Sequence, residues 1–233
     1  MHKSHSDHSA LYRWLPFALF MAFIGLDEVL RFLGHKGWIH LSPRDLLYLY
    51  PVKAISVGLL LLYFRRRYEE IRPQDLAQVK NLVLSISVGV AVFLLWINMD
   101  WSFGTHGKPA GFDPTIMSDY LTRLILIISR VFGAAVIVPI MEELFWRSWL
   151  LRYIIDHDFS KIQIGTFTWS SFLISTILFG LEHNYIIAGI MAGVAYSLLL
   201  YRTKSLASCI LSHAVTNFAL AIYVLATSQW RFW

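Results

Sequence analysis

The sequence predicts an all-α protein: a polytopic bundle of seven or eight transmembrane helices, folded as a single membrane domain over residues 1–233. Hydrophobic residues make up 57% of the chain and charged residues only 15%, far from the balance of a soluble domain. The mean hydropathy is positive. The apolar residues also gather in runs close to the roughly 20 residues that a bilayer-spanning helix needs. The chain therefore has room for these spans and short connections, and for little else.

The candidate spans follow a polar leader, residues 1–13, which contains His2, His5 and His8. No small-residue cleavage site follows this leader, so we do not expect a removable signal peptide. Seven apolar runs are long enough to be considered as spans. They cover residues 16–32, 46–64, 79–97, 120–139, 167–181, 186–201 and 206–226.

Basic residues predict how these runs are oriented. With a cytoplasmic N-terminus, twelve Lys and Arg residues lie on the inner side and four on the outer side, as the positive-inside rule requires. Several tryptophans fall at the outer ends, as expected for an interfacial belt. We therefore expect a multi-pass integral membrane protein with a cytoplasmic N-terminus.

Two connections have recognisable character. Residues 98–118 are rich in Gly and Pro and are typical of an external loop. Residues 147–159 have apolar side chains at helical spacing with charges between them, which favours a helix that lies in or dips into the membrane interface.

Composition also excludes some classes of protein. The basic residues are scattered at the ends of apolar runs without aromatic interleaving, so we expect no nucleic-acid partner. The single cysteine, Cys209, excludes a disulfide framework and a thiolate metal cluster. Its expected role is packing.

Three places in the apolar runs or at their ends qualify most strongly as candidate functional sites, because charge in a bilayer is costly. In the first, Glu142 and Glu143 follow Pro139, which we expect to break the fourth span. On a helix, Glu143 and Arg147 are four residues apart and can pair. Glu142 is turned about 100° away and is free to react.

The other two places are the segment that ends in His183, after Phe179, and the pair His213 and Asn217, which share a helix face. Together the three sites supply a base for water and donors for an oxyanion, as water-activated acyl hydrolysis requires. Histidine and carboxylate are also ordinary zinc ligands. From the residues alone, a hydrolase, an ion or proton transporter and a binding scaffold all stay open. In a transporter, Arg31, Lys53 and Arg130 should line a path.

This assignment of spans places two of the candidate residues far apart. If the fourth and fifth spans are straight and full length, Glu142 lies near the inner surface and His183 near the outer one. We therefore expect a bend: either the helix restarts after Pro139, or residues 147–159 form a buried or re-entrant segment.

At these residues the sequence resembles the CAAX prenyl endopeptidase family, the CPBP or ABI group of intramembrane proteases. The family pattern appears in order as Glu142-Glu143-x-x-x-Arg147, Phe179-x-x-x-His183 and His213-x-x-x-Asn217. The resemblance covers about the last half of the chain and implies a catalytic core over residues 119–227. The residues around Glu142 and the aromatic C-terminus resemble the bacterial subgroup that accompanies exosortase systems, which implies the bacterial inner membrane.

The resemblance also implies roles. Glu142 with His183 activates the attacking water, and His213 and Asn217 stabilise the oxyanion. Glu143 and Arg147 hold the site in shape. The implied activity is intramembrane hydrolysis of a peptide bond near the membrane, with membrane lipid and a peptide or protein substrate as partners.

No cofactor is expected, since the family is better described by a glutamate-activated water than by a bound metal. The alternative is a divalent metal, zinc, held by Glu142, His183 and His213. A non-catalytic scaffold, a bacteriocin-immunity protein of the same family and a transporter remain alternatives.

Overall fold

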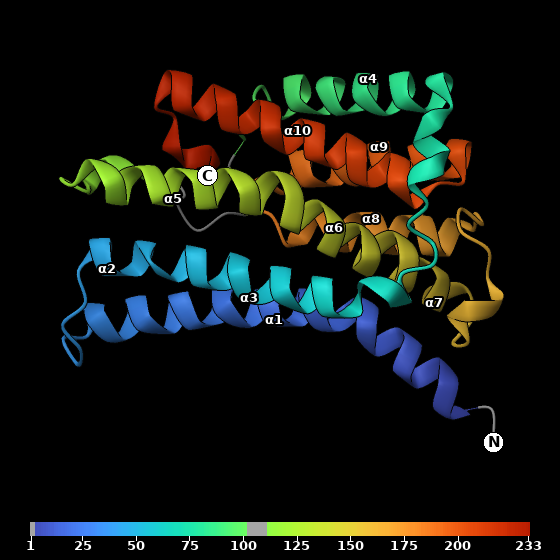
Figure 1. The fold of residues 1–233 in the computed structure, drawn as a ribbon, viewed down its shortest axis with the longest axis horizontal. Helices are drawn as coiled ribbons and strands as arrows, with labels where there is room; N and C mark the ends of the chain where they lie inside the picture. The colour runs from blue at the N-terminus through green and yellow to red at the C-terminus, as the bar shows by residue number, and fades with distance from the viewer. Residues whose placement is uncertain (1–2, 102–110) are drawn as a thin grey trace.

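The computed structural model describes residues 3–101 and 111–233, and side chains from residue 9 onward within these ranges. All regular secondary structure in these residues is helical, which confirms the all-α prediction (Figure 1). The main helices are α1 (Lys3–His35), α2 (Pro43–Leu47), α3 (Leu49–Phe64), α4 (Val79–Trp96), α5 (Tyr120–Phe132), α6 (Val138–Glu143), α7 (Leu151–Ile155), α8 (Trp169–Leu181), α9 (Ile186–Thr203) and α10 (Leu206–Thr227).

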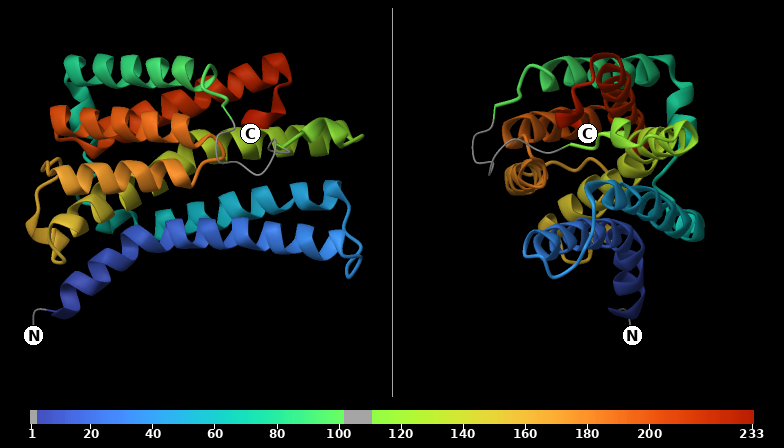
Figure 2. Two further views of the ribbon diagram at one scale, coloured as in Figure 1. Left: turned by 180° about the vertical axis from the view of Figure 1, so that it is seen from behind. Right: turned by 90° about the vertical axis from the view of Figure 1, so that its left-hand side faces the viewer.

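The helices lie along one common axis and form a bundle (Figures 1 and 2). Helix α1 packs along α3, α4 along α10, and α8 along α9. Large apolar side chains cover much of the outer surface, as lipid-facing positions require. Examples, each about half exposed or more, are Leu59, Val83, Ile128, Leu173 and Ile222.

Five helical stretches among the described residues are long and apolar enough to cross a membrane, which confirms a polytopic protein. They do not confirm the predicted count of seven or eight spans. Helix α8 is apolar but has only 13 residues. The five stretches are Pro43–Arg67, Val79–Trp96, Tyr120–Ile155, Ile186–Thr203 and Leu206–Thr227.

The longest stretch, Tyr120–Ile155, continues through Pro139 without interruption, so the predicted break at this proline is wrong. The reason is a π-helical turn over Gly133–Ile137, in which the N–H of Val138 donates to the carbonyl of Gly133. In that pattern the missing N–H of Pro139 would leave the Ala134 carbonyl without its partner. Asn217 donates its side-chain amide to that carbonyl instead, at 2.8 Å.

The prediction of a separate interfacial helix over residues 147–159 is also wrong. A second π-helical stretch, Leu144–Leu150, and helix α7 continue the same long helix as far as Ile155. Arg147 and Arg152 are buried in this helix. Their charges therefore face the protein interior, where they find hydrogen-bond partners, and do not mark a surface segment.

The short length of α8 explains how Glu142 and His183 come to lie at the same depth in the bundle. Ile155 lies thirteen residues after Glu142, and Glu182 lies thirteen residues after Trp169, so both acids are equally far from the turn that joins α7 to α8. At 1.5 Å per residue this distance is about 20 Å. The turn between α8 and α9 accordingly lies within the bundle, short of the end that α5 reaches (Figure 2). Glu142 and His183 meet without the predicted restart of the helix after Pro139, although the long helix changes direction between α5 and α6 (Figure 1).

Close helix crossings hold this turn in place. A Cβ on Gly180 would lie 2.3 Å from Ile190 Cγ1, and one on Gly189 would lie 2.9 Å from the Cα of Gly180. Small residues allow such approaches between membrane helices. On the other side of the site, a Cβ on Gly89 would lie 2.4 Å from the Ser212 carbonyl oxygen, so α4 and α10 are in backbone contact.

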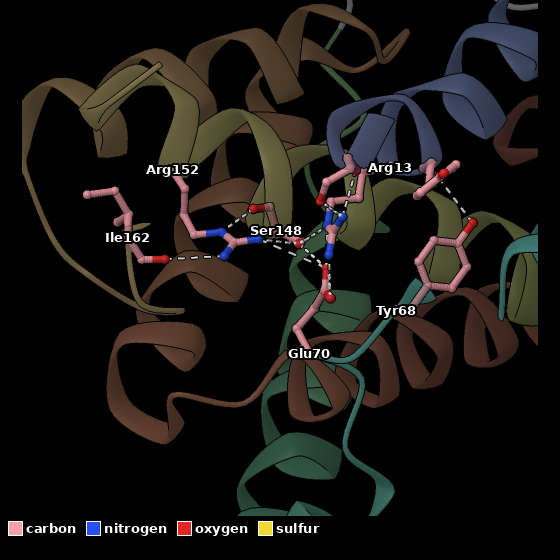
Figure 3. Close-up of polar contacts among 8 residues, drawn as sticks. Arg13, Tyr68, Glu70, Ser148, Arg152 and Ile162 are labelled. Carbon is pink, nitrogen blue, oxygen red and sulfur yellow. Dashed lines mark hydrogen bonds and ion pairs between the residues drawn. The ribbon is translucent and has the colours of Figure 1, made fainter. Parts of the chain in front are cut away.

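A buried polar network joins α1 to the long helix at the N-terminal end of the bundle (Figure 3). Arg13 donates to both carboxylate oxygens of Glu70, at 2.6 and 2.8 Å. Ser148 also donates to Glu70 and accepts from Arg152 at 2.9 Å. Three segments that are distant in sequence are therefore fixed by one carboxylate.

Candidate functional site

The three motifs meet at one cavity of about 400 Å³. Glu142 enters it from α6, His183 from the turn after α8, and His213 and Asn217 from α10. Glu142 is 7% exposed, and its Oε2 atom is buried without a hydrogen-bond partner. A buried carboxylate oxygen without a partner is rare, because it loses its hydration without compensation.

Glu143 forms the ion pair with Arg147 that their four-residue spacing predicts. Its Oε1 atom lies 3.3 Å from Arg147 Nη1 and 3.0 Å from His213 Nδ1. Glu143 and Arg147 are 0% and 2% exposed at the side chain. Glu143 therefore links the first motif to the third, and it orients the imidazole so that Nε2 faces Glu142 Oε2, 3.9 Å away.

Arg147 is held by aromatic faces as well as by Glu143. Its guanidinium carbon lies 4.3 Å from the ring centroid of Phe179 and 5.5 Å from that of Tyr196. Such cation–π contacts stabilise a desolvated guanidinium. It also donates to the Gly193 carbonyl at 3.4 Å. Phe179, which begins the second motif, therefore supports Arg147, which ends the first motif.

His183 is oriented by the same phenylalanine. Its Nδ1 atom lies 2.7 Å from the Phe179 carbonyl oxygen, one helical turn back. Because a carbonyl oxygen only accepts hydrogen bonds, Nδ1 carries the proton and Nε2 keeps a free lone pair. The free nitrogen can accept a proton from water or bind a metal.

The residues Tyr196 and Thr216, which the sequence analysis did not single out, support His213. The ring of Tyr196 stacks on the imidazole at 4.9 Å, with 22° between the planes. Tyr196 donates to Thr216 at 2.8 Å, and Thr216 donates to the Gly89 carbonyl at 2.9 Å. Neither residue belongs to a motif, so only the tertiary contacts reveal them.

Glu182 is a further residue that sequence reasoning left out of the site. It accepts a hydrogen bond from Trp146 Nε1 at 2.9 Å. Glu142, Glu182 and His183 each bring a ligand atom into one group in which all of these atoms lie within 4.8 Å of one another. The available signal was an acidic residue next to His183 in an apolar run.

These donors fit a divalent metal. One imidazole nitrogen and two carboxylate oxygens are a set that zinc accepts, and Glu142 Oε2 has no partner among the described residues. The set differs from the predicted one, because Glu182 joins Glu142 and His183 while His213 is bound to Glu143. A metal there would act as a Lewis acid on water or a carbonyl.

Asn217 lines the cavity but has one amide hydrogen committed to the Ala134 carbonyl. A primary amide has two donors, so the second stays available. All four predicted catalytic residues thus border one cavity, with Glu143 and Arg147 behind them.

Comparison with known proteins identifies the family of this segment. Residues 124–219 match the family model described as type II CAAX prenyl endopeptidase Rce1-like. The match confirms the family predicted from the three motifs, and it lies within the predicted core, residues 119–227. No curated protein and no solved structure matches the chain. The Rce1-like family is a family of proteases, which supports peptidase activity at the level of the family.

Proposed function

We propose that this integral membrane protein, which carries the Rce1-like CAAX prenyl endopeptidase match over residues 124–219, is an intramembrane endopeptidase that uses a glutamate-activated water. The observation that carries the proposal is the unpartnered, buried Oε2 atom of Glu142 at a cavity shared with His183 and His213. A general base needs a free lone pair within reach of water and substrate.

In the proposed reaction, a water molecule in the cavity gives a proton to Glu142 while its oxygen attacks the carbonyl carbon of the substrate peptide bond. His183 Nε2 accepts the second hydrogen bond of the water and so orients it. The tetrahedral intermediate collapses as Glu142 returns the proton to the departing nitrogen. The products are a carboxylic acid and an amine, and Glu142 is again a carboxylate.

His213 and Asn217 would stabilise the negative charge on the intermediate. Because His213 Nδ1 is bound to the carboxylate of Glu143, Nε2 donates only when the imidazole carries both protons. The second amide hydrogen of Asn217 is the other donor. Removing one such donor typically lowers the rate by about 10²- to 10³-fold.

A metal is the alternative for the same site. Glu142, Glu182 and His183 would hold it, and it would supply Lewis-acid activation of water. With a metal bound, the side chains of the site would still bind the substrate and transfer protons. The two versions differ in Glu182, which contacts the metal in one and only positions Trp146 in the other.

The test is peptide cleavage by the purified full chain in lipid nanodiscs. A pooled peptide library, each member with an apolar anchor and a randomised segment, serves as substrate. We expect cleavage by the natural protein and a loss of at least about 100-fold in Glu142→Gln and in His183→Ala. Undiminished cleavage in both variants would exclude the proposed mechanism.

The matched control is Glu28→Gln, an exposed acid on α1 that does not line the cavity. We expect it to retain full activity. Activity after treatment with a chelator, together with the metal content of the protein, measures the contribution of a metal. Water activated by Glu142 without a metal predicts unchanged activity.

A further inference from the structure

We infer that residues 228–233, which we call the strap, control access to the cavity of Glu142: the strap closes the cavity on one side and has to move aside before a peptide is cut. The inference rests on the proposed peptidase function and adds a means of regulating it. The strap follows α10 and lies outside the matched segment, residues 124–219. Three of its residues line the cavity: Arg231, Phe232 and Trp233.

A left-handed residue turns the chain back at the end of α10. Ser228 has a φ of 55°, and its backbone N–H donates to the Val224 carbonyl at 2.8 Å, which ends the helix. Residues other than glycine adopt this conformation at a cost in energy. The strap therefore returns toward α5 instead of leaving the bundle (Figures 1 and 2). A change in the backbone angles of Ser228 would swing the strap away from the cavity.

One part of the strap rests on the turn that carries His183. The ring centroid of Phe232 lies 5.6 Å from that of Tyr185, which is two residues after His183, and 6.1 Å from that of Tyr223 on α10. Phe232 is the only buried residue of the strap. Its side chain therefore fills the space between α10 and the α8–α9 turn.

The other part of the strap reaches the opposite wall of the cavity. Trp233 packs against the buried cluster that includes Tyr50 of α3, and its ring centroid lies 6.3 Å from that of Phe112. A Cβ on Gly111 would lie 2.1 Å from the Trp230 carbonyl oxygen, so the two backbones are in contact. The strap thus spans the cavity from the α8–α9 turn to α3.

The polar attachment of the strap is weak, as a segment that moves requires. Arg231 lies 3.0 Å from Asp100, and the two side chains are 39% and 35% exposed. An ion pair this exposed contributes little stability, because water and salt screen it. Gln229 adds one hydrogen bond to the Tyr223 hydroxyl, at 2.9 Å. Most of the strap is only partly buried, and such segments open at a small fraction of the free energy of global unfolding.

The size of the cavity indicates why the strap has to move. An endopeptidase cuts an internal bond, so the substrate chain continues on both sides of Glu142. The cavity of about 400 Å³ is at the low end of pockets that hold one small molecule. Displacing Phe232 and Trp233 would extend it between α10 and α3, where the continuing chain could lie.

The experiment measures access and cleavage separately, with the full chain in lipid nanodiscs. For access, Val138→Cys places a thiol at the cavity one helical turn before Glu142, and a water-soluble methanethiosulfonate labels it. The natural Cys209 is fully buried and gives a low background. For cleavage, the anchored peptide library is used without this reporter. We expect Arg231→Glu, which repels Asp100, to raise both rates about two- to tenfold.

Exchange of the two charges separates release of the strap from general loosening of the fold. Asp100→Arg combined with Arg231→Glu restores an ion pair, so both rates should return to their natural values. The matched control is Lys161→Glu, which reverses an exposed pair with Asp158 outside the cavity and should change neither rate. Phe232→Ala, which removes the buried ring of the strap, should raise both rates.

Unchanged labelling in both Arg231→Glu and Phe232→Ala overturns the inference. So does fast labelling that the charge exchange leaves fast, because a loosened fold would then explain it. Faster labelling without faster cleavage, in a protein that cleaves, also overturns it, since access would not limit the reaction. If neither the natural protein nor any variant cleaves a peptide, the peptidase proposal fails, and the labelling rates alone decide whether the strap closes the cavity.

Discussion

Glu143 shows how one buried carboxylate can serve two partners. It accepts hydrogen bonds from Arg147 and from His213 through the same oxygen, Oε1. The Oε2 atoms of Glu143 and of its neighbour Glu142 are both buried without a hydrogen-bond partner, but only Glu142 lines the cavity. The turn of about 100° between consecutive helical residues separates the two carboxylates, so one supports the site while the other is free to react.

The substitution Glu143→Gln tests this division at the scale of the residue. It removes the negative charge beside a fully buried guanidinium, which typically costs about 3–5 kcal/mol of stability. We expect a lower thermal unfolding temperature and a strong loss of cleavage, because His213 also loses its orienting partner. Unfolding of the detergent-purified protein and the peptide assay are the two measurements.

A second variant distinguishes a structural effect from a catalytic one. In Glu143→Gln with Arg147→Met the buried charge is gone, so we expect much of the stability to return, since buried ion pairs are often replaceable by apolar groups. Activity should stay low. Full activity in this double variant would contradict the role given to Glu143.

At the scale of elements, two helical features bring the motifs together. The π-helical turn at Gly133–Ile137 lets the helix continue through Pro139, and the short α8 turns back inside the bundle at the level of Glu142. The turn depends on Gly180, whose carbonyl accepts the backbone N–H of His183 at 3.1 Å. The position of His183 therefore depends on how closely α8 and α9 pack.

Gly180→Ala tests this dependence. The new Cβ would lie 2.9 Å from both the Ile186 carbonyl oxygen and the Ile190 backbone nitrogen, which cannot move without shifting α9. Overpacking of this kind usually costs about 1–3 kcal/mol. We expect a lower unfolding temperature and at least a tenfold loss of cleavage as His183 is displaced.

The control for this prediction is Gly25→Ala in α1, where nothing lies within 4 Å of the added Cβ. A helical glycine with free space around it should tolerate alanine, with unchanged or slightly higher stability. If both variants keep normal stability and activity, the α8–α9 crossing does not position His183.

At the scale of the whole molecule, the Glu70 network fixes α1 and the connection after α3 against the long helix (Figure 3). Burial favours the neutral form of Glu70, but the hydrogen bonds and charge of Arg13, together with Ser148, outweigh burial and hold the pKa of Glu70 below its ordinary value. The carboxylate therefore stabilises the fold when ionised.

This lowered pKa predicts how stability depends on pH. A group whose pKa is lower in the folded state contributes fully above its unfolded value, near 4.5, and the contribution is lost as the pH falls through the folded pKa. We expect Glu70→Gln to be less stable than the natural protein at neutral pH, with a gap that narrows below that value. Thermal unfolding of both proteins across this range measures the gap. A constant gap would show that ionised Glu70 does not hold the contact.

Several features of this protein were predictable because they depend on local sequence. The length and apolar character of the runs indicate membrane helices, since no other structure satisfies the backbone in lipid across such lengths at this composition. The four-residue spacing between Glu143 and Arg147 predicted an ion pair on one helix, and the structure contains that pair. The ordered motifs indicated the family, which the match over residues 124–219 confirms.

The convergence of the site was decided by tertiary structure. Whether Pro139 breaks a helix depends on a widened turn before it and on Asn217, which lies 83 residues from the carbonyl that it caps. Whether Glu142 meets His183 depends on two helical segments of equal length, one before and one after the connection between α7 and α8. Glu182, Tyr196 and the cations Lys53 and Arg130 join the site through contacts between helices that are distant in sequence. Periodicity describes which face of a helix is apolar, but not which neighbour covers that face or at what height, because packing between helices sets both.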